Sequence, residues 1–408
     1  MSTRRCAARF RVRPLAALAA GATAAGMLVA APTAALAAPA VAHAAHTTAQ
    51  AAAATSPTGF NPVTARLVDT RIDGTQVPKG QVQGAVFVTL PSSVPTGTTA
   101  VLNVTALGAA GPGFVAVFPA GTTPAPTSSN VNYSAGTTQP DAVLVNTPAD
   151  GRIVLNVGGA KADLVVDLTG YLPASAFTAV GPTRLADSRS NVGLPKGPLT
   201  GHETITLPSS VPSTAGLVAL TLTATGAQHP GNIVAYPSGG TVPGTSNLNF
   251  SPGITQANLV LVKPAGGKVD LQISGGPTQV VVDLSGFTPA GSSVISLDPK
   301  RIADSRSGTG LPKGLVTGAV TITLPSSVPS TASAALINVT AASAVGSGFV
   351  VAYPGGSKQP GTSNVNYSKG HDDANLVLVP IGPNNTVSLF VGGAGAQLIV
   401  DLSGYVSQ

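Results

Sequence analysis

Arginine and aspartate recur together three times along this chain, and they are the first residues whose types suggest chemistry. The pattern Arg-Leu/Ile-x-Asp-Thr/Ser-Arg occupies residues 66–71 and returns at 184–189 and 301–306. Near the end of each copy a further aspartate lies within an apolar run. Arginines placed in this way either form ion pairs with carboxylates of the same chain or make a two-pronged site for the carboxylate or phosphate of a ligand.

The closing aspartates favour the structural interpretation. Asp167 is flanked by valines and leucines, so we expect it to be buried, and a buried carboxylate is tolerated only when it is paired and hydrogen-bonded. We predict that Arg66 or Arg71 pairs with Asp167 and ties the first strand of the copy to the last. The predicted structural ion-pair residues are Arg66, Asp69, Arg71, Asp167, Arg184, Asp187, Arg189, Asp283, Arg301, Asp304, Arg306 and Asp401.

A repeated asparagine pattern is the candidate for ligand binding. Ser-Asn-Val/Leu-Asn-Tyr/Phe occurs once per copy and supplies Asn130, Asn132, Asn247, Asn249, Asn364 and Asn366. Amides both donate and accept hydrogen bonds, as sugar hydroxyls require. Hydrogen bonding within turns and edge strands also explains the pattern, and we favour that explanation. Elsewhere Asn258 and Asn375 match each other, and we assign Ala142 to their place in the first copy.

Catalytic groups are hard to find. The histidines of the repeats, His202, His229 and His371, occupy unrelated places in their copies, so we expect solvated loop residues rather than a Ser-His-Asp arrangement. No motif for serine, zinc or nucleotide chemistry is present, and Glu203 is the only glutamate. No metal or cofactor is predicted, and we expect a protein that is not an enzyme.

The elements that carry these residues are short strands. Apolar runs alternate with Gly, Pro, Ser and Thr turns, giving about eight strands in each copy. In residues 220–225 leucine or alanine alternates with threonine, which predicts one buried and one exposed face. We predict an all-β fold of three tandem β-sandwich (jelly-roll-like) domains of about eight strands each. A six-bladed propeller is the alternative, but the two halves of a copy do not resemble each other.

The repeats also define the expected domain boundaries, which are 58–173, 177–289 and 294–408. The short joints between them predict a semi-rigid rod of independent units. Residues 1–37 are predicted to be a signal peptide, because a basic start and an apolar run precede Ala35-Leu36-Ala37. Residues 38–57 are predicted to be an Ala/Thr-rich linker.

Charge and cysteine content narrow the partners. The net charge of +6 arises in the leader, since five of the 21 basic residues are arginines within residues 1–13 and the other 16 face 15 acidic residues. The repeats therefore have no basic surface for nucleic acid or an anionic membrane. The only cysteine is Cys6, so the domains are expected to hold together without disulfides.

Taken in their fixed order, the arginine pattern, the asparagine strand and the ending Val-Asp-Leu-x-Gly-Tyr/Phe resemble a β-rich repeat of secreted actinobacterial proteins, often appended to cell-wall or extracellular hydrolases. The resemblance covers residues 58–408 and implies an accessory module for attachment to the envelope or a polymer. It brings no known site residues with it.

Two function classes follow from these observations. The first is a non-catalytic, secreted or cell-wall-associated protein for surface attachment and adhesion, with other surface proteins as partners and no membrane span after signal cleavage. The second is an array of modules that bind carbohydrate, either an extracellular glycan or a cell-wall polymer such as peptidoglycan. An extracellular hydrolase is the third alternative.

Overall fold

The computed structural model describes residues 59–126 and 128–408, so the predicted signal peptide (1–37) and Ala/Thr-rich linker (38–57) lie outside the described residues. Within these ranges the regular structure is strands, apart from one 3₁₀ turn, η1 (Pro383–Asn385). This agrees with the period-two patterning and frequent turn residues of the sequence.

Each copy contains seven strands. In the first copy they are β1 (Asn61–Asp69), β2 (Val82–Thr89), β3 (Thr99–Leu107), β4 (Gly113–Pro119), β5 (Val131–Tyr133), β6 (Thr138–Asn146) and β7 (Arg152–Leu172). In the second they are β8 (Thr178–Asp187), β9 (Leu199–Thr206), β10 (Val218–Thr225), β11 (Gly231–Pro237), β12 (Leu248–Phe250), β13 (Gln256–Val262) and β14 (Lys268–Phe287). In the third they are β15 (Val294–Asp304), β16 (Val316–Thr323), β17 (Ala332–Ala342), β18 (Gly348–Pro354), β19 (Val365–Tyr367), β20 (Asp373–Pro380) and β21 (Thr386–Ser407).

One long strand in each copy belongs to two layers. The second half of β7 lies between β1 and β3, and β3 pairs with β6, which makes the inner layer. The first half of β7 lies between β2 and β4, and β4 pairs with β5, which makes the outer layer. The strand changes layer just after Gly158, at Gly159, whose φ of +78° favours glycine. The last two expected strands of a copy are thus one strand, so a copy has seven strands instead of eight.

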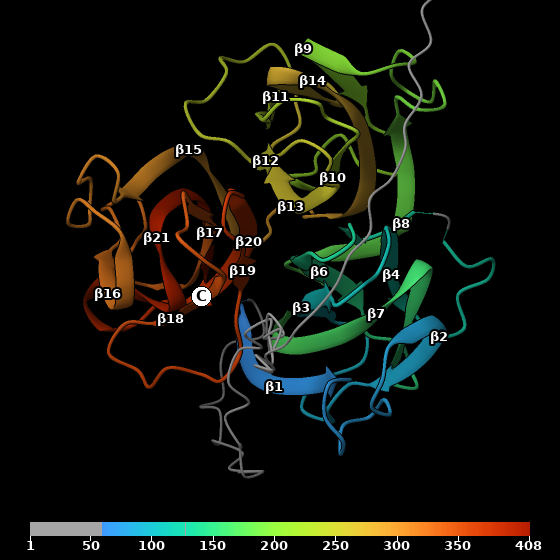
Figure 1. Cartoon of the computed structure of the whole chain (residues 1–408), viewed down its shortest axis with the longest axis horizontal. Helices are drawn as coiled ribbons and strands as arrows, with labels where there is room; N and C mark the ends of the chain where they lie inside the picture. Colours follow the sequence, from blue (N-terminus) through green and yellow to red (C-terminus); the bar gives the residue numbers. More distant parts are fainter. Residues whose placement is uncertain (1–58, 127) are drawn as a thin grey trace, which may run out of the picture. The chain divides into compact units, whose positions relative to one another are not determined.

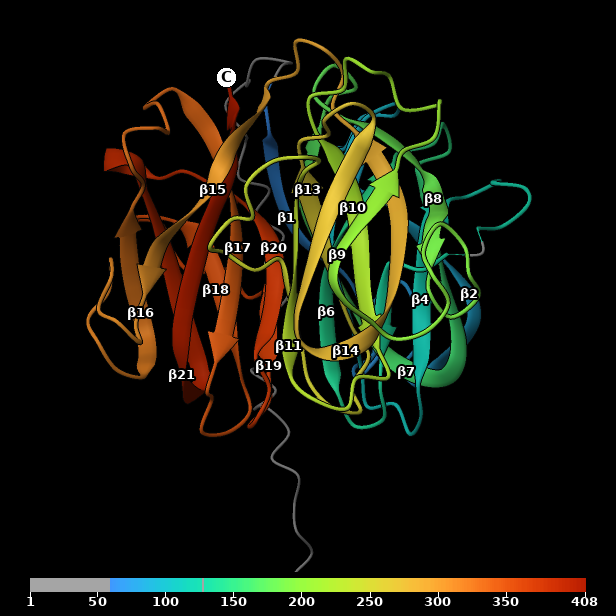
Figure 2. The same cartoon turned by 90° about the horizontal axis from the view of Figure 1, so that it is seen from above.

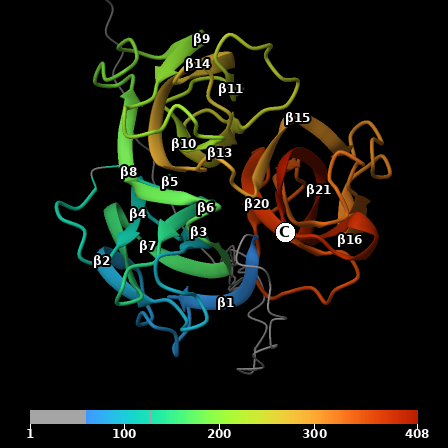
Figure 3. The ribbon, with the colours of Figure 1, turned by 180° about the vertical axis from the view of Figure 1, so that it is seen from behind.

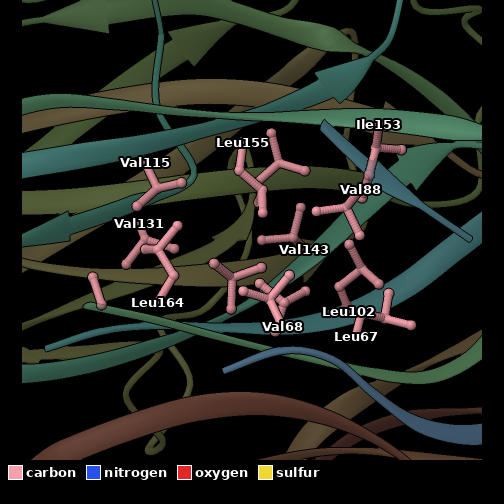
Figure 4. Packing of buried hydrophobic residues seen from close by; sticks show 14 of the residues in the cluster. Leu67, Val68, Val88, Leu102, Val115, Val131, Val143, Ile153, Leu155 and Leu164 are labelled. Carbon is pink, nitrogen blue, oxygen red and sulfur yellow. The ribbon is translucent and has the colours of Figure 1, made fainter. Parts of the chain in front are cut away.

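The two layers of a copy enclose a core of their own. In the first copy Leu102 and Leu164 of the inner layer face Val115 and Leu155 of the outer layer, and all four are at most 1% exposed (Figure 4). The other copies have equivalent cores. The β-sandwich prediction is therefore confirmed, and the propeller does not fit because the two layers of a copy face each other across one core.

The copies do not form a rod, because a fourth apolar cluster joins them. Equivalent inner-layer residues of all three copies, among them Val101, Ala219 and Leu336, pack together on the side of the layer away from each copy's own core. Strands β6, β13 and β20 accordingly lie next to one another where the copies meet (Figures 1, 2 and 3). The inner layers are thus buried on both faces. This corrects the half-exposed interpretation of residues 220–225, where Thr221 is 1% and Thr223 4% exposed.

A cyclic set of hydrogen bonds closes the three copies on one another. Asp141 of the first copy accepts from the backbone N–H of Leu259 in the second (2.9 Å), and Asn258 of the second accepts from Leu376 in the third (3.0 Å). The cycle closes when Asn375 of the third copy accepts from the N–H of Ala142 in the first (3.0 Å). The copies are therefore bound to one another through equivalent contacts, each copy as donor to one neighbour and acceptor from the other.

The residue of the first copy that is equivalent to Asn258 and Asn375 is Asp141. This corrects the assignment of Ala142 made from the sequence. Strand register places Asp141 opposite Val104, as Asn258 lies opposite Leu222 and Asn375 opposite Val339. The amide Nδ2 groups of both asparagines donate to main-chain carbonyls, at 2.6 and 2.7 Å. Asp141 has no such donor when ionised, and its Oδ2 is buried without a hydrogen-bond partner. Burial raises the pKa of Asp141 well above its usual value.

We predict that Asp141→Asn stabilises the chain. The new amide would donate to the carbonyl oxygen of Asn130, as its two counterparts do to their own copies, and one such hydrogen bond contributes about 1 kcal/mol. A higher midpoint of thermal unfolding at pH 7 is the expected result. The converse change, Asn258→Asp, should lower the midpoint at the same pH. A drop for Asp141→Asn would contradict this account of the joint.

Candidate functional site

The arginine that begins each repeated pattern lies against the closing aspartate of the same copy. Arg66 Nε is 2.8 Å from Asp167 Oδ1, Arg184 Nε is 2.6 Å from Asp283 Oδ1, and Arg301 Nε is 2.9 Å from Asp401 Oδ1. The partners sit opposite each other in the strand register, so the pairs tie β1 to β7, β8 to β14 and β15 to β21. Of the two arginines considered, the first makes this contact in every copy.

The second arginine of each pattern binds the aspartate two residues before it. Arg71, Arg189 and Arg306 each place a guanidinium NH2 group 2.7 Å from Asp69, Asp187 and Asp304 in turn, and the first arginine of the pattern also reaches that aspartate. Each copy thus holds two arginines between two buried aspartates. Because every guanidinium is already paired within the protein, these clusters are not forks awaiting an anionic ligand.

The pKa values of the two aspartates in a cluster are shifted in opposite directions. Hydrogen bonds from Arg189 hold the pKa of Asp187 below its usual value, and Arg306 does the same for Asp304. Burial raises the pKa of Asp283 despite its contact with Arg184. The first aspartate is therefore held as a carboxylate by its arginines, while the second lies deep in the inner layer.

Three of the six candidate asparagines are committed to the protein itself. The side-chain oxygens of Asn130, Asn247 and Asn364 accept hydrogen bonds at 2.7 Å from backbone N–H groups of the adjacent strand. All three lie just before the short outer strands and hold them to the adjacent strand, so the side-chain oxygens have a structural role. This agrees with the turn and edge-strand interpretation of the pattern.

The other three, Asn132, Asn249 and Asn366, lie half-buried at the boundaries between copies. Each accepts a hydrogen bond from the serine three residues before it. Asn132 also donates to Thr223 Oγ1 of the second copy at 3.2 Å. Asn132 thus contacts the next copy, and Asn249 lies at a surface that also contains Arg301 and Arg306 of the third copy.

A cleft of about 710 Å³ opens at the boundary between the second and third copies. From the second copy it is lined by amide side chains of β11, β12 and β14, namely Asn232, Asn249 and Gln272, together with residues 242–246. From the third copy it is lined by the arginine pair, Thr340 and Asp372. The cleft brings one predicted asparagine and two predicted arginines together, which separate copies would not do.

The cleft has no excess of positive charge. Arg301 and Arg306 are matched by Asp304 and Asp401, and Asp372 adds one more carboxylate, so no cation is left over for an anionic ligand. The available groups are amides and hydroxyls, which both donate and accept hydrogen bonds. Such a lining suits an uncharged ligand with many hydroxyl groups.

Sequence reasoning did not find Asn232, Gln272 or Thr340. Asn232 and Gln272 belong to no repeated motif, since register puts phenylalanine in place of Asn232 in both other copies. No single-sequence signal marks these residues, because they become neighbours only when the copies close on one another.

The sequence analysis also did not find a cluster of polar side chains around His202 and Asp270. His202 lies on β9, not in a loop, with Nε2 3.1 Å from Asp270 Oδ2. Although burial opposes ionisation of Asp270, hydrogen bonds from Gly239, Thr204, His202 and Ser238 lower its pKa to about 2. The aspartate binds both the serine and the histidine, so the histidine does not stand between hydroxyl and carboxylate as a base for serine would.

The described ranges contain no group of three or more His, Cys, Asp or Glu side chains placed to hold a metal ion. In residues 59–126 and 128–408 there is also no helix that is long and apolar enough to span a membrane. His229 and His371 do not line the cleft themselves, although their chain neighbours Pro230, Gly370 and Asp372 do.

Comparison with family models finds no match, and neither does comparison with curated proteins. Among solved structures, the chain is similar to the CBM22-1–CBM22-2 tandem domain of Paenibacillus barcinonensis Xyn10C, with 8% identity over 57% of this chain and 94% of that one and a TM-score of 0.18. It is also similar to a chain of Sulfolobus Turreted Icosahedral Virus, with 11% identity over 86% and 91% of the two chains and a TM-score of 0.19. At these TM-scores neither likeness bears on function.

Removal of a closing aspartate should destabilise the chain. Asp283→Ala leaves Arg184 partly unpaired in the inner layer, and loss of one partner from a buried pair costs about 3 kcal/mol. The midpoint of thermal or denaturant unfolding is expected to fall. Asp150→Ala, which breaks an exposed pair with Arg152, is the matched control and should change little. Equal midpoints for the two variants would refute the strand-tying role.

Stability should also depend on Asp373, which lies at the boundary between the second and third copies. Burial raises its pKa to about 7, and Asp372 adds to this, against hydrogen bonds from Ser368 and Gln256. A raised pKa means that the folded state holds the proton more tightly than the unfolded state. Its contribution is therefore full below about pH 4, the usual aspartate pKa, and is lost as the pH rises toward 7.

The measurement is the unfolding midpoint at pH 5, 6, 7 and 8, which should fall across this series. In Asp373→Gln the fall should be smaller, because glutamine does not titrate and is the residue found at the equivalent Gln256. The aspartates whose pKa is lowered act only below pH 4 and do not interfere in this range. An identical slope in the variant would rule out Asp373 as its source.

Proposed function

We propose that this chain is a non-catalytic attachment protein of the cell surface or wall that binds a neutral polysaccharide in the cleft between its second and third copies. The observation that carries the proposal is the cleft lining. Amides of Asn232, Asn249 and Gln272 face hydroxyl and guanidinium groups of the next copy, without excess positive charge. Amide-rich clefts without excess positive charge favour ligands whose hydroxyls need both donors and acceptors.

A catalytic role has less support in the same cleft. Its only unpaired acid is Asp372, which is exposed and accepts a hydrogen bond from the N–H of Ser343. Hydrolysis of a glycosidic bond by the common mechanisms requires two carboxyl groups across the bond, one of them protonated. Secretion, on which this function depends, is supported by the predicted signal peptide at residues 1–37.

Binding should be lost when the cleft amides are removed. The full chain is expected to be retained by at least one of cellulose, chitin and purified cell wall, and to bind a soluble oligosaccharide of the same type. Asn249→Ala combined with Gln272→Ala should weaken this binding by about tenfold or more, as expected for the loss of hydrogen bonds worth about 1 kcal/mol each.

The matched control is Asn132→Ala, which changes the equivalent asparagine at the boundary between the first and second copies. It should leave binding in this cleft unchanged, with both variants melting as single folded species. If the unaltered chain binds none of the three polymers, or if the cleft variant binds as well as the control, the proposed function is wrong.

A further inference from the structure

The boundary between the third and first copies has hydrogen bonds equivalent to those around the cleft, but different side chains at two positions. Asn103 Nδ2 of the first copy donates to the carbonyl oxygen of Ser363 in the third at 2.7 Å. Asn338 of the third copy makes the equivalent bond to Ser246 of the second at 3.1 Å. The segments before β19 and β12 therefore meet the following copy in the same way.

The asparagine, the serine and the arginine pair at this boundary each have a counterpart at the cleft. Asn366 takes the place of Asn249, and the third copy's Ser363 holds it as Ser246 holds Asn249. From the first copy, the pair of Arg66 and Arg71 takes the place of the pair at the cleft. Both arginines are paired with Asp69 or Asp167, so neither guanidinium is free for a ligand.

Two positions differ between the two boundaries, and the third copy has an aromatic residue at both. Strand register places Phe349 where the second copy has Asn232, and Phe390 where it has Gln272. The ring centroids lie 6.2 Å apart with an angle of 40° between the planes, and both side chains are partly exposed. The Phe349 ring lies over Gly392, where an added Cβ would stand only 2.3 to 2.8 Å from three ring atoms and would displace the ring.

These rings are not part of an interior. The inward-facing residues of β18 and β21 form the core of the third copy, and neither phenylalanine belongs to it. The equivalent Phe114 of the first copy is likewise 36% exposed over Gly158. Asn366 lies opposite Phe349 in the strand register, so the pair of phenylalanines offers an apolar face next to a hydrogen-bonding amide.

We propose that the boundary between the third and first copies is a second saccharide site, in which Phe349 and Phe390 stack against the C–H face of a sugar ring while Asn366 binds its hydroxyls. The inference rests on the proposed function for its ligand class, a neutral saccharide chain. That class fits both features, because one face of a pyranose ring presents C–H groups and its edge presents hydroxyls. An anionic ligand would find both guanidinium groups already paired.

The test is the stoichiometry of binding by the full chain in isothermal titration calorimetry. The probes are cellohexaose, chitohexaose and mannohexaose, each added separately. With the probe that binds, the unaltered chain should take up two molecules. Phe349→Leu combined with Phe390→Leu keeps the apolar bulk but removes the rings, and it should take up one. Phe349→Tyr, which keeps the ring, should still take up two.

The two sites are distinguished by testing the cleft variant alone and in combination with the phenylalanine variant. Asn249→Ala with Gln272→Ala should remove only the cleft site, leaving one molecule bound, and the four changes together should leave none. A stoichiometry of one in the unaltered chain that the leucine variant does not change would overturn the second site and leave the proposed function standing. Binding of none of the probes by the unaltered chain would overturn the second site, and the proposed function would then be decided by the binding test on cellulose, chitin and cell wall. Unfolding midpoints of all variants at pH 7 establish that the losses do not come from unfolding.

Discussion

The side-chain hydrogen bond from one copy to the backbone of the next is the constraint on which the rest of this structure depends. Made by Asp141, Asn258 and Asn375 in turn, it returns to the copy where it began. It fixes the inner layers against one another, buries the threonine face of β10 and places the arginine pairs of one copy beside the asparagine strand of the copy before it. The cleft exists because of this closure.

The two halves of each long strand, β7, β14 or β21, have different roles in their copy. The half in the inner layer carries the paired aspartate and is buried on both faces, so its residue types are restricted in all three copies. The half in the outer layer has one face toward solvent and has changed freely, with Asn156, Gln272 and Phe390 at one register position. A rigid interior thus supports three boundaries with different surfaces.

Much of this could be predicted from the sequence, and the failures have one cause. The strands, the sandwich and the contact between Arg66 and Asp167 follow from patterns inside one copy, where alternation and the cost of burying a charge are informative. The rod, the exposed threonine face and the assignment of Ala142 instead of Asp141 were wrong. Each concerns a surface that meets another copy, and a polar residue that faces a polar partner looks in sequence like one that faces water.

Closure also fixes how many copies the chain has room for. In an open array of repeats, units are gained or lost at an end with little effect on those that remain. Here a chain with two or four copies would leave an N–H group such as that of Ala142 facing no acceptor, or would have to change the angle at every joint. Duplication within the gene, which lengthens most tandem-repeat proteins, would meet a steep loss of stability here, so diversity is expected to arise by substitution at the outer layer.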